Sequence, residues 1–145
     1  MSPEQIFSVV NLLALAGWVL LAVLPGRRGV ATAITAVAIP AALAVTYVGI
    51  VAVQWSGSEG GFGSLAQVAQ LFANRWLLLA GWVHYLAFDL FVGSWEVRDA
   101  RARGIPHWLV LPCLFFTFMF GPAGWLLYLS VRGAASRTAP AGSPR

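Results

Sequence analysis

Three long stretches of the chain contain no charged residue, and a fourth contains only one. Asp, Glu, Lys and Arg are absent from residues 5–26, 29–58 and 104–131. Each of these stretches is longer than the ~20 residues that a helix needs to cross a ~30 Å hydrocarbon core. Lipid favours helices here even where Val, Ile and Thr are frequent, because a backbone in lipid must satisfy its own hydrogen bonds. The pattern predicts an all-α, polytopic membrane protein with four transmembrane helices, at about residues 6–24, 30–53, 76–95 and 108–131.

Proline and glycine residues mark the breaks between these helices. Residues 25–28, Pro-Gly-Arg-Arg, predict a tight turn after the first helix. Pro40 predicts a bend near the middle of the second helix, and Pro106 opens the fourth. We expect residues 1–135 to form a single transmembrane domain. Residues 136–145, a tail of small residues and prolines, are expected to be disordered.

The segment between the second and third predicted helices has two parts. Trp55 to Gly63 is rich in Gly and Ser and predicts a flexible loop. Ser64 can then cap a short helix whose apolar residues recur at helical spacing, at Leu65, Val68, Leu71 and Phe72. This predicts a short helix in the membrane interface. An extension of the third helix is an equally good interpretation.

The composition also indicates that this chain lies in lipid. Of 145 residues, 59% are hydrophobic and 10% are charged, whereas soluble domains contain about 25% charged residues. All nine basic residues are Arg at or near helix ends, an arrangement that suits lipid phosphates, so we expect no nucleic-acid partner. The absence of Lys excludes a lysine nucleophile. Because Cys113 is the only cysteine, an intrachain disulfide and a thiolate metal cluster are also excluded.

The amino terminus and the arginines bear on topology. Met1 to Glu4 lacks the positive charge of a signal peptide, so we expect the first hydrophobic segment to be a mature transmembrane helix. Five arginines follow the first and third predicted helices and four lie on the other side. Because the first helix usually has the most influence on orientation, we expect both termini outside the cytoplasm.

Two polar residues lie at membrane depth in the third predicted helix. An ionised residue near the bilayer centre costs roughly 2.5 to 3.5 kcal/mol. Helical geometry places Asp89 about 9 Å from one end of this span and His84 about 12 Å from the other. We therefore expect both to face protein or a water-filled cavity. The two residues do not share a face, because the step between them rotates by about 140°.

Helical phase sorts their neighbours into two stripes. One contains Trp82, Tyr85, Asp89, Gly93 and Glu96, and the other contains His84, Phe88, Phe91 and Trp95. Asp89 can act as a buried acid or proton carrier, with aromatic rings around an apolar ligand. Alternatively, the rings only pack and Asp89 bonds to another helix, through Thr117, Tyr128 or Asn11. For His84, a catalytic role and a structural role as a hydrogen-bonded residue are equally good interpretations.

Two further candidates lie at the membrane surface, and a third lies in the fourth helix. Asp99 and His107 flank the loop before that helix, where Asp99 can instead pair with Arg101 or Arg103. Two His and two Asp could in principle bind one divalent metal. Membrane desaturases, however, place many histidines around two irons, whereas this chain has only two histidines. We therefore expect no metal and no cofactor. Residues 121–124, Gly-Pro-Ala-Gly, predict a helix kink that either lines a cavity or only packs.

The sequence HYLAFDLFVGSW at residues 84–95 is followed by Asp99, GIPH at 104–107, Pro112 and GPAG at 121–124. This ordered combination resembles the abscisic-acid-deficient-four-like membrane proteins, whose plant members are associated with neoxanthin formation. The resemblance implies an activity that opens the epoxide of violaxanthin and rearranges it to an allene without redox change. Carried over by motif, the first positions to examine are His84, Asp89, Asp99 and His107. Arginine without lysine and richness in Ala and Gly favour a bacterial member, in the cell inner membrane.

We therefore hypothesise an isomerase or related modifying enzyme for a carotenoid, another terpenoid or a similar apolar lipid. Asp89 would donate a proton to oxygen, and His84 or His107 would accept one from carbon. The substrate would contact Trp82, Tyr85, Phe88, Trp95, Gly121 and Pro122. The alternative is a non-catalytic membrane subunit that binds a pigment or lipid or stabilises a partner enzyme. A homo-oligomer or a membrane enzyme is the protein partner to expect.

Overall fold

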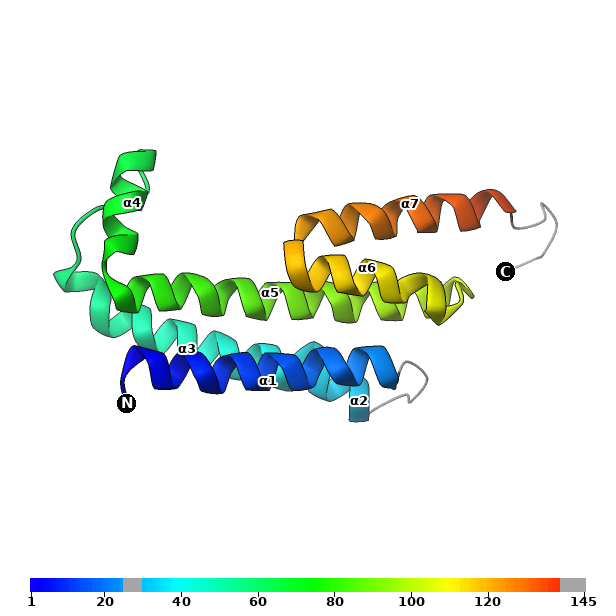
Figure 1. Cartoon of the computed structure of the whole chain (residues 1–145), viewed down its shortest axis with the longest axis horizontal. Helices are drawn as coiled ribbons and strands as arrows, with labels where there is room; N and C mark the ends of the chain where they lie inside the picture. Colours follow the sequence, from blue (N-terminus) through cyan, green and yellow to red (C-terminus); the bar gives the residue numbers. More distant parts are fainter. Residues whose placement is uncertain (25–29, 139–145) are drawn as a thin grey trace.

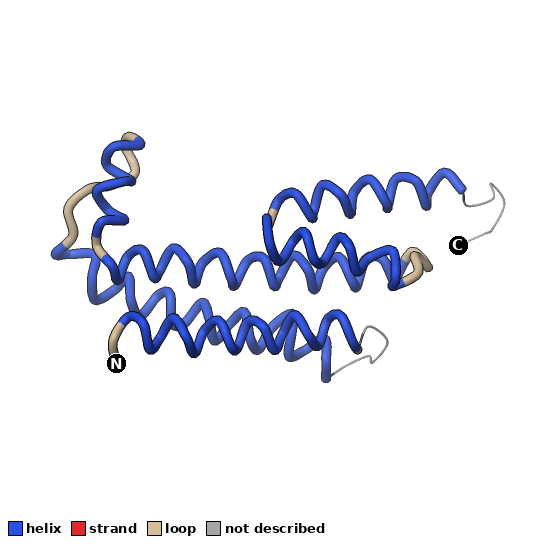
Figure 2. The backbone as a smooth tube through the Cα atoms, viewed as in Figure 1, coloured by secondary structure: helices blue, strands red, loops and turns tan. Residues whose placement is uncertain are grey.

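The computed structural model describes residues 1–24 and 30–138, and every regular element in this part of the chain is a helix (Figures 1 and 2). The long helices α1 (Pro3–Val23), α3 (Ile39–Gln54) and α5 (Arg75–Ala102) lie side by side (Figure 1). Within the described residues, three segments are long and apolar enough to cross a membrane: Pro3–Val23, Ile34–Gly57 and Arg75–Ala102. The all-α class is confirmed, with three such segments in place of the four that the sequence predicts.

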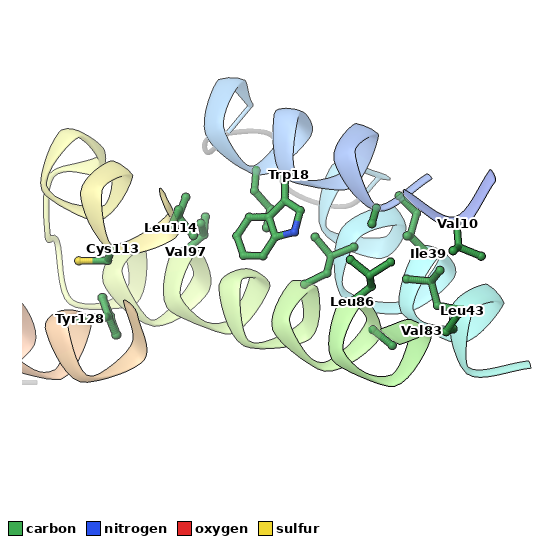
Figure 3. Close-up of a cluster of buried hydrophobic side chains, with 14 of the residues drawn as sticks. Val10, Trp18, Ile39, Leu43, Val83, Leu86, Val97, Cys113, Leu114 and Tyr128 are labelled. Carbon is green, nitrogen blue, oxygen red and sulfur yellow. The ribbon is translucent and has the colours of Figure 1, made fainter. Parts of the chain in front are cut away.

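Helices α1 and α5 approach closely because glycines lie where they meet. A Cβ atom on Gly17 would lie 2.7 Å from Leu90 Cδ2, and one on Gly93 would lie 2.7 Å from the ring of Trp18. Between helices in lipid, packing of this kind replaces the hydrophobic effect as the source of association. Trp18 lies in the middle of the resulting core, which Figure 3 shows from Val10 to the end where α6 and α7 join it.

The second predicted helix contains a wider turn just before Pro40. A short helix α2 (Val30–Ala33) leads into the π-helix η1 (Ile34–Ala38), and α3 follows. Proline has no N–H to bond the carbonyl four residues earlier, and a π-helical turn is a common local adjustment to such a break. The predicted turn at residues 25–28 lies outside the described residues.

A separate short helix precedes α5, as one of the two interpretations predicts. After the 3₁₀ turn η2 (Trp55–Gly57), α4 (Leu65–Ala73) begins at Ser64, whose hydroxyl accepts from the backbone N–H of Gln67. Asn74 ends α4 and caps α5, since its side chain accepts from the N–H of Trp76 at 2.9 Å. Figure 1 shows α4 directed away from the bundle at a steep angle to α5. The alternative interpretation, an extension of the third helix, is therefore wrong.

Helix α5 continues beyond its predicted end at Trp95. The charged run from Glu96 to Arg103 lies beyond the predicted span, and its residues up to Ala102 form the last two turns of α5. The charges do not break the helix because they divide between its faces: Glu96 is buried and Arg98 is exposed. The chain then turns at Gly104, where φ is +67°.

The predicted single helix over residues 108–131 is wrong. The chain instead forms a hairpin of two antiparallel helices, α6 (His107–Phe120) and α7 (Pro122–Thr138) (Figure 1). Gly121 reverses the chain at a φ of +50°, in the left-handed region that favours glycine. Helix α6 has 14 residues and is therefore only ~21 Å long. Helix α7 includes the first residues of the predicted disordered tail, and residues 139–145 lie outside the described part.

Candidate functional site

Asp89 lies close to the middle of α5. This helix has 28 residues, so it is ~42 Å long at ~1.5 Å per residue and extends beyond a ~30 Å hydrocarbon core at both ends. A core centred on the helix would therefore place Asp89 near the bilayer centre. Its side chain is half-buried, and Oδ2 is a buried oxygen without a hydrogen-bond partner among the described residues.

The tip of the α6–α7 hairpin covers Asp89. A Cβ atom on Gly121 would lie 3.1 Å from Asp89 Oδ1 and 3.2 Å from Oδ2, so a side chain at this position would press on the carboxyl group. The turn satisfies its own backbone: the N–H of Gly121 donates to the carbonyl of Thr117 at 2.9 Å, and the N–H of Gly124 donates to the carbonyl of Gly121 at 3.1 Å. Irregular backbone is tolerated at membrane depth where protein buries it, which agrees with the burial of Gly121.

Glu96 provides a second carboxyl group on the same face of α5, about two turns beyond Asp89. Its side chain is 0% exposed. The hydroxyl of Thr117 donates to Glu96 Oε1 at 2.9 Å, whereas Oε2 is buried without a partner among the described residues. The two residues are ~10 Å apart along the helix axis. The sequence reasoning did not propose Glu96 as a site residue, although the helical stripe through Asp89 already contained it.

Tyr85 connects this region to a large groove. Its hydroxyl donates to the backbone carbonyl of Phe118 at 3.1 Å, and its ring contacts that of Trp82 at 5.3 Å. Trp82 in turn donates from Nε1 to Asn11 Oδ1 at 3.2 Å. The groove, which we call the α1–α5 groove, has a volume of about 710 Å³ and is lined by Pro3, Glu4, Phe7, Ser8, Phe72, Arg75, Leu78, Leu79, Gly81, Trp82 and Tyr85.

His84 and Phe88 lie on another face of α5. Both side chains are exposed, and their rings stack with centroids 4.6 Å apart. Tyr47 of α3 contacts His84 at 5.6 Å. His84 therefore lies at the surface of the described chain beside α3, and the expectation that it faces protein or a water-filled cavity stays a prediction.

Asp99 and Trp95 take part in contacts between α5 and α7. Asp99 Oδ2 accepts from the hydroxyl of Tyr128 at 2.7 Å and from Arg103 Nε at 2.8 Å, and Arg132 Nε lies 3.5 Å away. The hydrogen bond to Asp99 raises the pKa of Arg103 above its usual value. Trp95 meets the ring of Tyr128 edge-on at 5.6 Å. Of the two interpretations of Asp99, the structure favours the partner of Arg103.

His107 lies at the start of α6, where its Nε2 is 3.0 Å from the carbonyl oxygen of Ala22 at the end of α1. The structure thus does not gather the four residues carried over by motif into one site. It brings Asp89 together with Gly121, Tyr85 and Glu96, while Pro122 is exposed beside this cluster. No group of three or more His, Cys, Asp and Glu within the described ranges is arranged to hold a metal ion.

Comparisons with known proteins identify the family. Neither the curated proteins nor the solved structures contain a match to this chain. A family model described as ABA DEFICIENT 4-like matches residues 5–128, which include most of α1, the whole of α5 and the hairpin turn. This match covers most of the chain, and the chain therefore belongs to the ABA4-like family, as the motifs in residues 84–124 indicated.

Proposed function

We propose that this membrane protein is a non-redox isomerase or related modifying enzyme for a carotenoid, another terpenoid or a similar apolar lipid. The site consists of Asp89 and Glu96 beneath the tip of the α6–α7 hairpin. One observation carries the proposal: each carboxyl group has a buried oxygen without a hydrogen-bond partner among the described residues. Such groups are costly in a membrane and tend to be functional.

A pair of carboxyl groups can supply both halves of an acid–base isomerisation. The neutral acid donates a proton to an oxygen of the substrate while a C–O bond opens, and a carboxylate accepts a proton from carbon as a new double bond forms. The proton count is unchanged and no electron acceptor is needed. Asp89 and Glu96 are separated by ~10 Å along the helix, and Trp18 packs against Gly93 between them. A substrate group that meets both carboxyl groups would therefore have to displace the ring of Trp18.

Asp89 is our candidate acid because it lies nearest to the groove. Tyr85 lines the groove and lies one turn before Asp89 on the same face. Glu96 replaces His84 and His107 as the candidate base, because both histidines lie away from Asp89. In a bacterium the reaction would take place in the inner membrane, on molecules that already reside in the lipid.

The test is pigment and apolar-lipid analysis of membranes that contain the wild-type chain, Asp89→Asn or Glu96→Gln. Both amides keep the side-chain shape and can still accept a hydrogen bond, so both variants should accumulate and keep their thermal stability in detergent. Product formation should fall at least about 100-fold, the usual contribution of a general acid or base. If both variants keep most of the activity, the protein is better described as a subunit that binds a pigment or lipid.

A further inference from the structure

We propose that a small cavity between η1 and α5 binds one monovalent anion of the size of chloride. The cavity has a volume of about 20 Å³ and lies between the end of α1, the α2–η1 segment and α5. Its polar walls are Thr32, Thr35, Ser94, Arg98 and Arg101, and the rest are Leu and Val side chains. Three observations carry the inference: a buried hydroxyl group, two positive charges and the size of the cavity.

The hydroxyl group of Ser94 is the first observation. This side chain is 1% exposed, and its Oγ is buried without a hydrogen-bond partner among the described residues. A serine hydroxyl in a helix can donate to the carbonyl group one turn earlier, and Ser8, Ser130 and Ser136 do so in this chain. Because a buried hydroxyl without a partner is costly, we expect Ser94 to donate to a group held in the cavity.

Two arginines bring positive charge to the same cavity. Ser94, Arg98 and Arg101 follow each other at helical spacing on one face of α5. Arg98 is held beside Ser94, since its Nε donates to the backbone carbonyl of Ser94 at 3.2 Å. A guanidinium group has five N–H donors. Each arginine can therefore bind an anion in addition to its partners in the protein.

The carboxyl groups near this end of α5 lie elsewhere. Among the described residues that line the cavity, none is Asp or Glu. Glu96 lies on the opposite side of the helix, because the step from Ser94 rotates by about 200°. The carboxyl group of Asp99 bonds to Arg103 and Tyr128. The side-chain polar groups in the walls are thus hydroxyls and guanidinium groups, which bind anions through charge-assisted hydrogen bonds.

The size and depth of the cavity select the kind of anion. A volume of about 20 Å³ suits a particle of the size of a water molecule, so a chloride or bromide ion fits and the phosphate group of a lipid is too large. Ser94 lies ~10 Å further into the bundle along α5 than Arg101. Charges interact more strongly at that depth than at the surface. A bound anion would connect η1 to α5 and hold the π-helical turn in place.

The first test measures the melting temperature of the full-length protein in a neutral detergent while sodium chloride replaces sodium gluconate at constant ionic strength. Gluconate is too large for the cavity, so chloride should raise the melting temperature by about 3–6 °C and the effect should saturate. Ser94→Ala should lose this shift. In gluconate it should melt no lower than the wild type, because it removes a hydroxyl without a partner.

Ser130→Ala is the matched control, because the hydroxyl of Ser130 lies on α7, outside the cavity. This variant should keep the chloride-dependent shift of the wild type. A Ser94→Ala variant that also keeps the full shift would overturn the proposal.

The second test measures the binding of radioactive chloride to the protein in nanodiscs of phosphatidylcholine. The wild type should bind chloride saturably, and bromide should compete. Arg98→Gln should weaken binding at least about fivefold, as expected for the loss of a charge-assisted hydrogen bond. Arg137→Gln removes an exposed arginine that lies outside the cavity and should bind chloride like the wild type. Equal affinity in the two variants would contradict the assigned site.

Other occupants of the cavity would give different results. If chloride neither binds nor shifts the melting temperature, the cavity holds only water and the proposal is overturned. If phosphatidylglycerol stabilises the protein and chloride does not, the arginines bind a lipid headgroup, and the proposed halide site is wrong.

Discussion

The carboxyl group of Asp89 lies against Gly121, since a Cβ atom on Gly121 would come within 3.1 Å of Asp89 Oδ1. Gly121→Ala should therefore displace the carboxyl group. The left-handed backbone, with φ at +50°, adds a strain of about 1–2 kcal/mol. We expect a protein that still inserts into the membrane and loses most of its product formation in the membrane assay.

Gly133→Ala is the matched control, because a Cβ atom on Gly133 meets nothing within 4 Å. This variant should keep both the activity and the thermal stability of the wild type. If Gly121→Ala reduces membrane accumulation as much as activity, Gly121 only packs the hairpin.

Gly124→Ala should open the hairpin. A Cβ atom there would lie 2.0 Å from the backbone N of Thr117, and a backbone atom cannot swing aside as a side chain can. We expect a loss of about 1–3 kcal/mol, typical of an overpacked contact, measured as a lower melting temperature in detergent. Gly49→Ala, where nothing lies within 4 Å, should melt like the wild type. A stable Gly124→Ala would mean that α6 and α7 do not pack as described.

Thr117→Val should separate the structural role of Glu96 from its chemical role. The substitution removes the hydroxyl that donates to Glu96 Oε1 and leaves a buried carboxyl group without its partner, at a cost of about 1–3 kcal/mol. Glu96→Gln keeps an oxygen that can accept from Thr117, so it should cost little stability. Thermal unfolding of both variants checks this, and a larger loss in Glu96→Gln would contradict the assigned hydrogen bond.

Tyr128→Phe should weaken the packing of α7 against α5 without a specific effect on catalytic activity. It removes the 2.7 Å hydrogen bond to Asp99, and a hydrogen bond to a charged group is worth about 1.5–3 kcal/mol. The melting temperature should fall while activity per folded protein stays unchanged. Tyr47→Phe is the control, because within the described residues its hydroxyl has no hydrogen-bond partner. A selective loss of activity in Tyr128→Phe would return Asp99 to the list of catalytic candidates.

The hairpin changes the expected topology. Helix α7 runs back toward the end of α5, so Arg132 and Arg137 join Arg98, Arg101 and Arg103 at one end of the bundle, while Arg75 lies at the other (Figure 1). Positively charged ends remain in the cytoplasm. Reporter fusions at Ser2 and Ser136 should therefore report the outside and the cytoplasm. The sequence-based expectation of both termini outside would be restored if both fusions report the outside.

The sequence predicted the helical class because uncharged stretches of sufficient length are visible without any tertiary information. It predicted α4 as one of two interpretations, through the cap at Ser64. It could not predict the hairpin, because hydropathy is the same for one long helix and for two short antiparallel ones. The difference depends on the backbone of Gly121, whose positive φ a Gly-Pro pair permits but does not require.

The candidate site was predicted in part. Asp89 was found because a carboxyl group in a long apolar stretch is unusual. Glu96 lies just beyond the predicted end of the third helix, and only the continuation of α5 buries it. His84 was considered with Asp89 only because both lie deep in the predicted span. The rotation of about 140° between them along the helix already placed them on different faces.

With the hydrocarbon core centred on α5, the α6–α7 hairpin reaches only the middle of the bilayer, and the two leaflets are unequal for a molecule that diffuses within the membrane. One leaflet then meets α6 and α7, whereas the other meets the α1–α5 groove and α4. For the proposed function, a substrate would then reach Asp89 from the leaflet that contains α4 and the amino terminus. A substrate confined to the opposite leaflet would have to flip before it could react, so the sidedness of its supply would control the rate.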